Sequence, residues 1–150
     1  MRLALYQPDQ AGNAGAILRL AACLAVPVDI VEPCGFAFSD RALKRAGMDY
    51  AEMAEMVRHR SWEEFAGAAS GRIVLLTTAG GVGLPDARFE ADDILLLGSE
   101  SKGVPASVHD RAALRVRIPQ APGTRSLNLA AAASISLAEA LRQTEQWPKQ

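Results

Sequence analysis

Cysteine and aromatic residues are scarce in this sequence, and each shortage excludes a class of protein. The 150 residues include two cysteines, Cys23 and Cys34, which is too few for a disulfide framework or a cysteine-rich zinc site. Cys23 falls in an apolar helical run, so we expect it to be buried. Aromatic residues make up only 5% of the chain, so the core must consist mainly of Ala, Leu, Val and Ile.

The chain also lacks a large net charge and a long hydrophobic run. Its formal net charge is −1, so it is not a strongly basic nucleic-acid-binding protein, and any contact with RNA or DNA must come from a local patch. No apolar stretch is long enough to cross a membrane, and residues 1–6 have the pattern of a strand rather than of a signal peptide. We therefore expect a cytoplasmic protein without a membrane partner.

What the chain does have is a regular succession of strand-like and helix-like segments. The unalternating apolar runs at 73–77 and 94–97 are typical of strands covered on both faces, which favours a parallel sheet. The length suits one domain, so we predict a single α/β domain over residues 1–150. Strands are predicted at 2–6, 28–31, 73–77, 94–97 and 115–118, with an ambiguous one at 53–57, and helices at 12–24, 40–46, 61–69 and 128–143.

Three polar or glycine-rich loops follow predicted strands, where ligands bind in open α/β sheets. The first, at 7–19, contains Asn13 and Arg19. The second, at 97–105, contains Gly98 and Glu100. The third begins at Ile118 with a Pro/Gly-rich loop and leads into a helix of small residues, and a weaker fourth loop follows Leu76.

These loops do not carry the common catalytic signatures. The first lacks the dinucleotide-binding glycine pattern, and no phosphate-binding P-loop is present. The two histidines, His59 and His109, lie beside charged surface residues, and neither a nucleophilic triad nor a cluster of metal ligands is evident, so we expect no metal. The polar residues near the loops favour orienting a polar substrate over attacking it covalently; they are Asn13, Arg19, Glu100, Arg125, Ser126 and Asn128.

Three segments together resemble the motifs of the SpoU branch of the SPOUT RNA methyltransferases. They are Asn-x-Gly-x-x-x-Arg at 13–19, LGSESKGVP at 97–105, and Ile-Pro followed by RSLNL at 118–129. Between them, GFAFSDRALKRAGMDY at 35–50 resembles the signature of a subfamily that methylates the ribose 2′-hydroxyl of the tRNA wobble nucleotide and has no RNA-binding extension. Ala16 and Lys102 depart from residues frequent in that subfamily, which bears on substrate choice and not on the chemistry.

The resemblance implies a fold, a cofactor and an assembly. The fold is a parallel-sheet α/β/α domain with a C-terminal trefoil knot, the cofactor is S-adenosylmethionine, and the site forms between the subunits of a homodimer that acts on tRNA. The positions that would line the cofactor pocket are Leu76, Gly98, Ile118, Ser126 and Leu127. Those that would serve catalysis are Arg19 with Asn13, Glu100, Ser126 and Asn128, and those that would bind RNA are Arg41, Lys44, Arg45 and Arg125.

Arg19 is the residue expected to matter most for methyl transfer. Because a guanidinium is almost never neutral in a protein, we expect Arg19 to stabilise the developing alkoxide or to contact the adjacent phosphate rather than to act as a general base. Two other functions stay open. One is the same reaction at another tRNA or rRNA site, and the other is a non-catalytic RNA-binding module that keeps the fold.

Overall fold

A parallel β-sheet organises the chain, which is described over residues 1–37 and 54–149 in a computed structural model. In this part of the chain the strand order is β3-β2-β1-β6-β4-β7-β5, and every neighbouring pair is parallel. The strands are β1 (Arg2–Tyr6), β2 (Val28–Val31), β3 (Met56–His59), β4 (Ile73–Leu76), β5 (Val82–Gly83), β6 (Ile94–Leu97) and β7 (Leu114–Arg117). The helices are α1 (Ala11–Cys23), α3 (Trp62–Ala68), α4 (Ala106–Arg111) and α5 (Leu129–Thr144), with a short 3-10 helix η1 (Leu84–Asp86).

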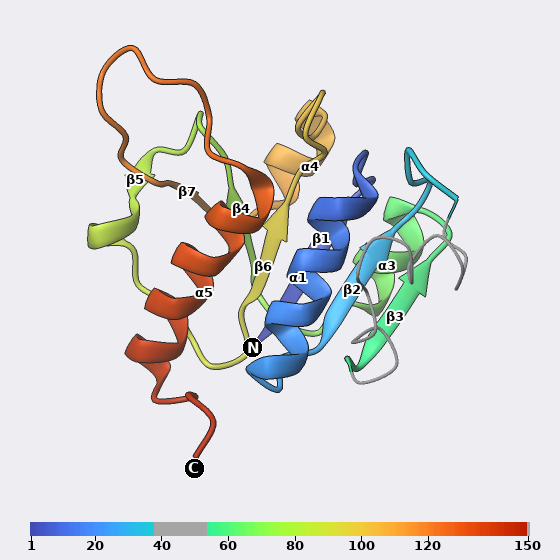
Figure 1. The fold of residues 1–150 in the computed structure, drawn as a ribbon, viewed down its shortest axis with the longest axis horizontal. Coiled ribbons are helices and arrows are strands. Elements are labelled where there is room, and N and C mark those ends of the chain that lie inside the picture. Colours follow the sequence, from blue (N-terminus) through green and yellow to red (C-terminus); the bar gives the residue numbers. More distant parts are fainter. Residues whose placement is uncertain (38–53, 150) are drawn as a thin grey trace.

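Helices cover both faces of the sheet, which confirms the predicted α/β architecture. Helices α1 and α5 pack side by side on one face (Figure 1), where they bury Leu3 and Leu5 of β1. The intervening Ala4 belongs to a second buried cluster, together with Phe65 of α3 and Val108 of α4. Because successive side chains of a strand point to opposite faces, α3 and α4 lie on the other side of the sheet.

Local sequence signals account for the apolar face of α1 and for the start of α3. The buried positions of α1 include Ala14, Ile17, Leu18 and Ala21, which is the spacing of an apolar face. The Ser61 side chain accepts a hydrogen bond from Glu64 N at the start of α3, as a capping box requires. The predicted helices at 12–24, 61–69 and 128–143 are therefore confirmed to within a residue or two, whereas the one predicted at 40–46 lies outside the described residues.

Several details differ from the predictions. The two-residue strand β5 and the six-residue helix α4 are too short to give a periodic pattern, and both were missed. Cys23 is exposed, because it falls on the outer side of α1 rather than on its apolar face. His59 is buried rather than on the surface, and its Nε2 lies 2.8 Å from Asp29 Oδ1.

The parallel arrangement brings the carboxyl ends of the strands to one edge of the sheet, where the segment after β7 rises above the sheet and returns into α5 (Figure 1). The loops after β1, β4 and β6 open at the same edge. Whether the chain is threaded there as a trefoil knot stays a prediction. None of the helices in the described residues is long and apolar enough to cross a membrane.

Candidate active site

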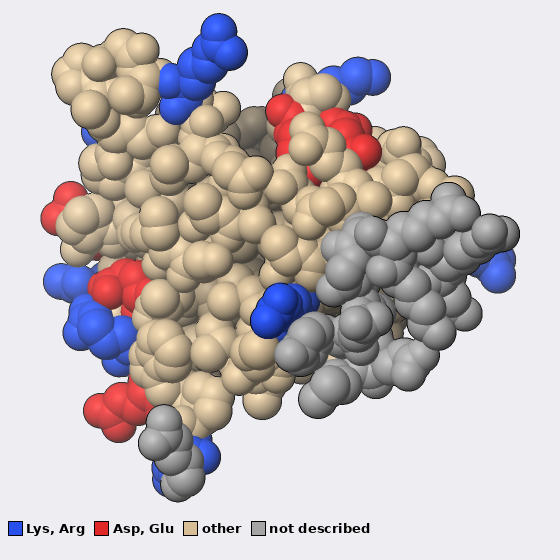
Figure 2. Space-filling model, viewed as in Figure 1, with Lys and Arg blue, Asp and Glu red and all other residues tan. Residues whose placement is uncertain are grey.

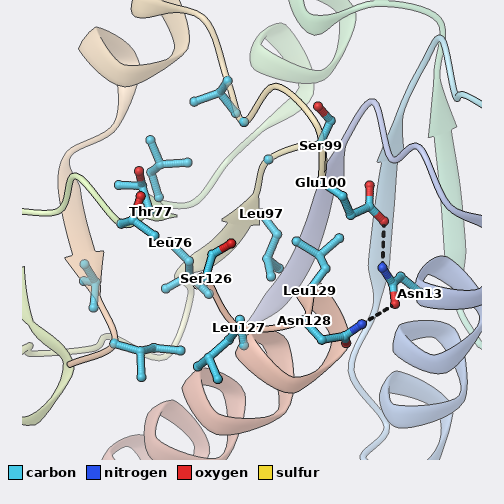
Figure 3. A pocket seen from close by; sticks show the side chains of 18 of the residues that line it. Asn13, Leu76, Thr77, Leu97, Ser99, Glu100, Ser126, Leu127, Asn128 and Leu129 are labelled. Atoms are coloured by element: carbon cyan, nitrogen blue, oxygen red, sulfur yellow. Dashed lines mark hydrogen bonds between the residues drawn. The ribbon is translucent and has the colours of Figure 1, made fainter. Parts of the chain in front are cut away.

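A pocket of about 400 Å³ lies at the carboxyl edge of the sheet, between the ends of β4, β6 and β7 and the start of α5 (Figure 3). Every residue predicted for catalysis or cofactor binding contributes to its lining, except Arg19. These lining residues are Asn13, Leu76, Gly98, Glu100, Ile118, Ser126, Leu127 and Asn128. Tertiary structure thus collects residues that are scattered over more than a hundred positions of the sequence.

Part of the pocket wall is apolar, beside a comparable share of polar surface. Leu76 is the last residue of β4, Ile118 directly follows β7, and Leu127 lies just before α5, so the three side chains come from three places in the chain. Leu127 is 38% exposed, which is unusual for a leucine and places apolar surface at a site that other molecules can reach. Such walls suit a flat, uncharged ring system.

The loop after β6 closes one side of the pocket with a tight backbone hairpin. Ser99 N donates to Gly103 O at 3.0 Å, and Gly103 N donates back to Ser99 O at 2.8 Å. A Cβ atom on Gly98 would lie only 2.7 Å from the carbonyl carbon of Gly103, and Gly103 itself has a φ of +64°. The hairpin therefore requires glycine at both positions and presents main-chain groups to the pocket.

A hydrogen-bond relay connects the three loops (Figure 3). Asn13 Nδ2 donates to Glu100 Oε1 at 3.1 Å, and Asn128 Nδ2 donates to Asn13 Oδ1 at 2.8 Å. Asn128 Oδ1 in turn accepts from Ala130 N at 2.9 Å and Ala131 N at 3.2 Å, which caps α5. Since a carboxylate only accepts hydrogen bonds, Glu100 sets the orientation of both amides down to the helix terminus.

A second set of hydrogen bonds fixes the loop after β1 to the loop after β6. Asp9 N donates to Glu100 Oε2 at 2.7 Å, and the Asp9 carboxylate accepts from Ser101 N at 2.8 Å and from the Ser101 hydroxyl. The hydrogen bonds from Ser101, the side-chain one first, lower the pKa of the Asp9 carboxyl below its ordinary value. Glu100 thus has both of its oxygens occupied.

Not all predicted residues lie at the pocket. Arg19 is exposed on α1 and does not line the pocket of its own chain. Arg125 is exposed in the loop before α5, and it is not among the lining residues either. The proposed RNA-binding residues Arg41, Lys44 and Arg45 lie outside the described residues.

The pocket also includes residues that sequence reasoning did not single out. Gln10 and Ser99 line it, and so does Thr77 of the weaker loop after β4. The polar and glycine-rich run from Thr77 to Gly81 could have indicated that the loop after β4 contributes to the pocket. No sequence feature marked Gln10 or Ser99 as a pocket residue, apart from their positions in the first and second loops.

Possible metal ligands do come together at one place in the described residues, contrary to the prediction that none cluster. The carboxylates of Glu90, Asp92 and Asp93 lie within 4.8 Å of one another. Arg72 contacts two of them, with Nη1 at 3.1 Å from Glu90 and Nε at 2.8 Å from Asp93. This group precedes β6, at the opposite end of the strand from the pocket, and forms an ion-pair network.

Comparison with known proteins identifies relatives over nearly the whole chain. A curated tRNA (cytidine(34)-2′-O)-methyltransferase of Ancylobacter novellus is 49% identical over 147 residues, covering 96% of this chain and 93% of its own length. A protein of the same name from Escherichia coli strain K12 is 38% identical, covering 95% of this chain and 93% of its own length.

Solved structures agree with the sequence relatives. A structure concerned with 2-OH methylation of C/U34 on tRNA superposes with a TM-score of 0.89 at 40% identity, covering 95% of this chain and 94% of that one. An AdoMet-bound rRNA methyltransferase from Sinorhizobium meliloti gives a TM-score of 0.83 at 32% identity, covering 94% of this chain and 55% of that one. The model of the SpoU rRNA methylase family matches residues 1–138, and the chain therefore belongs to this family.

Proposed function

We propose that this protein transfers a methyl group from S-adenosylmethionine to the ribose 2′-hydroxyl of nucleotide 34 of tRNA. The observation that carries the proposal is the pocket at the carboxyl edge of the sheet, where the three family motifs meet around one hydrogen-bond relay. The relatives named above, which this chain matches over almost its full length, carry the name of that reaction.

The pocket fits the cofactor in size and in chemistry. Its volume of about 400 Å³ lies within the usual range for small-molecule sites. Leu76, Ile118 and Leu127 offer apolar walls for an adenine ring, and Gly98 brings the backbone of the hairpin to the same pocket. Ser126 adds a hydroxyl to the same wall. When bound, the cofactor supplies a methyl group activated by the positive charge of its sulfur.

The residues of the chain then have to position the ribose and stabilise negative charge on its oxygen. Asn13 and Asn128 are held in fixed orientations by the relay, so their polar atoms add no reorganisation cost when substrate binds. Glu100 keeps both amides in place and is a positioning residue. Arg19 is the cation that would stabilise the developing alkoxide or contact the neighbouring phosphate.

The position of Arg19 leads us to propose a homodimer. Among the described residues, the centre of the face over α1 and α5 shows few charged side chains (Figure 2), and Ile135 on this helix pair is 44% exposed. The outer side of α1 carries the small residues Gly12, Ala16 and Cys23 together with Arg19, so another helix can approach it closely. Pairing these faces about a two-fold axis would move Arg19 of one subunit towards the pocket of the other.

The remaining parts of the proposal concern RNA binding and chain organisation. We propose that Arg41, Lys44, Arg45 and Arg125 contact tRNA, that residues 1–150 form one methyltransferase domain, and that the segment after β7 is knotted. The cytoplasm is the proposed location, because tRNA is the substrate. One sheet that joins strands from both ends of the chain supports the single domain.

The deciding experiment is methylation of defined tRNA transcripts with labelled S-adenosylmethionine, followed by mapping of the modified nucleotide. We expect one 2′-O-methyl group, at position 34. A methyl group at another tRNA or rRNA position would show that the protein catalyses the same reaction on a different substrate site. Absence of cofactor binding in calorimetry would leave only a non-catalytic RNA-binding module.

A further inference from the structure

Strand β7 carries two exposed arginines that the family motifs do not include. Arg115 and Arg117 alternate with Leu114 and Val116, and Val116 is 1% exposed in the core beneath α1 and α5. Because side chains alternate along a strand, both arginines point to the opposite face of the sheet. No residue of β7 belongs to the buried cluster on that face, so this side of β7 is open to solvent.

The charges of these two arginines are not compensated. Within residues 1–37 and 54–149, neither guanidinium makes a hydrogen bond or an ion pair. By contrast, Arg2, Arg72 and Arg142 each have a carboxylate partner within 3 Å. Two unpaired guanidinium groups side by side repel each other, so an anionic ligand at this place would relieve that repulsion.

The spacing of the two arginines and their position relate them to the pocket. Alternate residues on a strand lie about 7 Å apart, so the pair can contact two separate anionic groups of one extended ligand. Arg117 is followed directly by Ile118, which lines the pocket, and the loop that leads from there to α5 carries the exposed Arg125. Exposed arginines therefore occur on both sides of Ile118 along the chain, two on β7 before it and one in the loop after it.

We infer that Arg115 and Arg117 bind backbone phosphates of the RNA next to the nucleotide whose ribose enters the pocket. The inference rests on the proposed function and adds a phosphate-binding surface to it. A guanidinium fork matches phosphate geometry, and phosphate contacts supply affinity and register without reading the base. The pair should therefore contribute to binding of any tRNA substrate to a similar extent.

The test is the salt dependence of tRNA binding by the full chain carrying Arg115→Gln and Arg117→Gln together. Each phosphate contact contributes roughly 0.7–0.9 to the steepness of the plot of log affinity against log salt, so loss of two contacts should reduce the steepness by about 1.4 to 1.8. At physiological salt this corresponds to an affinity lower by about ten- to thirtyfold. Affinity for S-adenosylmethionine should not change, and circular dichroism checks that the variant is folded.

Two further variants keep the inference falsifiable. Arg60→Gln removes an exposed arginine beyond the opposite edge strand, β3, and should leave the slope unchanged. Arg115→Lys with Arg117→Lys keeps the charge and should retain most of the slope. A slope for the double glutamine variant equal to that of the wild type would overturn the inference while leaving the proposed function intact. If the wild-type protein neither binds nor methylates tRNA, both the inference and the proposed function are wrong.

Discussion

A Glu100→Gln substitution removes one acceptor from the relay at almost constant side-chain volume. Glu100 Oε1 accepts from Asn13 at 3.1 Å, and Oε2 accepts from Asp9 N at 2.7 Å, so both atoms facing these donors must be acceptors. Glutamine has only one acceptor oxygen. If that oxygen keeps the bond with Asn13, its NH₂ group faces the N–H of Asp9.

Reorienting the relay does not remove the conflict. If the glutamine amide flips so that its oxygen accepts from Asp9 N, the Asn13 amide must flip as well. The NH₂ group of Asn13 then faces the NH₂ group of Asn128. Asn128 must then turn as well, which points its NH₂ group at Ala130 N and Ala131 N, the two N–H groups it now caps. Every arrangement contains one contact between donors, so the substitution costs at least one hydrogen bond.

The expected magnitude follows from the partial exposure of the relay. One lost hydrogen bond to a charged acceptor and one unsatisfied donor cost about 1–2 kcal/mol of unfolding free energy where water has some access. For a chain of this length that corresponds to a melting temperature lower by about 2–8 °C. Because the loops that form the pocket lose a common anchor, affinity for S-adenosylmethionine and the methylation rate should decrease as well.

Urea unfolding, thermal melting and cofactor calorimetry measure these effects. The matched control is Glu63→Gln, which removes an exposed carboxylate from the first turn of α3 and should change the unfolding free energy by no more than about 0.5 kcal/mol. If Glu100→Gln is as stable as the control and binds the cofactor as the wild type does, the relay does not hold the site together.

Three other substitutions or reactions test separate parts of the structure. Arg19→Ala should abolish methylation and leave S-adenosylmethionine affinity nearly unchanged, because the role proposed for Arg19 is towards the ribose oxygen or the phosphate and not towards the cofactor; loss of cofactor binding would show a structural role. Gly98→Ala places a Cβ 2.7 Å from Gly103 and should cost about 1–3 kcal/mol in urea unfolding, whereas Gly67→Ala, in open space on α3, should stabilise by about 0.5–1 kcal/mol. Burial, and to a lesser extent Glu32, raises the pKa of the Cys34 thiol to about 11, so at pH 8 it should react with iodoacetamide about a hundredfold more slowly than in the unfolded chain. Mass spectrometry of the alkylated peptides measures that ratio, and equal rates would contradict it.

Most of the fold could be predicted because its elements have strong local signals. The apolar runs of β4 and β6 and the apolar residues of α1 at helical spacing are visible in short windows of sequence. Strand β5 and helix α4 could not be predicted, since each is too short for a period to be recognised. Their positions depend on β7, with which β5 pairs and which α4 directly precedes.

The candidate site shows a similar division. Motif residues predicted the pocket walls, and the structure brings Leu76, Ile118 and Leu127 around one cavity. The placement of Arg19 outside that cavity was not predictable. Helical spacing shows which face of the helix carries Arg19, but it does not show which part of the protein lies against that face. The exposure of Arg115 and Arg117 depends in the same way on which face of β7 the helices cover.

The sequence by itself determined the positions of most strands and helices, the glycines of the hairpin and the side chains available for chemistry. Only the tertiary structure decided that Asn13, Glu100 and Asn128, from three separate loops, share one hydrogen-bond relay. The physical reason is that strand order is a long-range property. Periodicity defines each strand and its faces, whereas the packing of the whole sheet determines which carboxyl ends become neighbours.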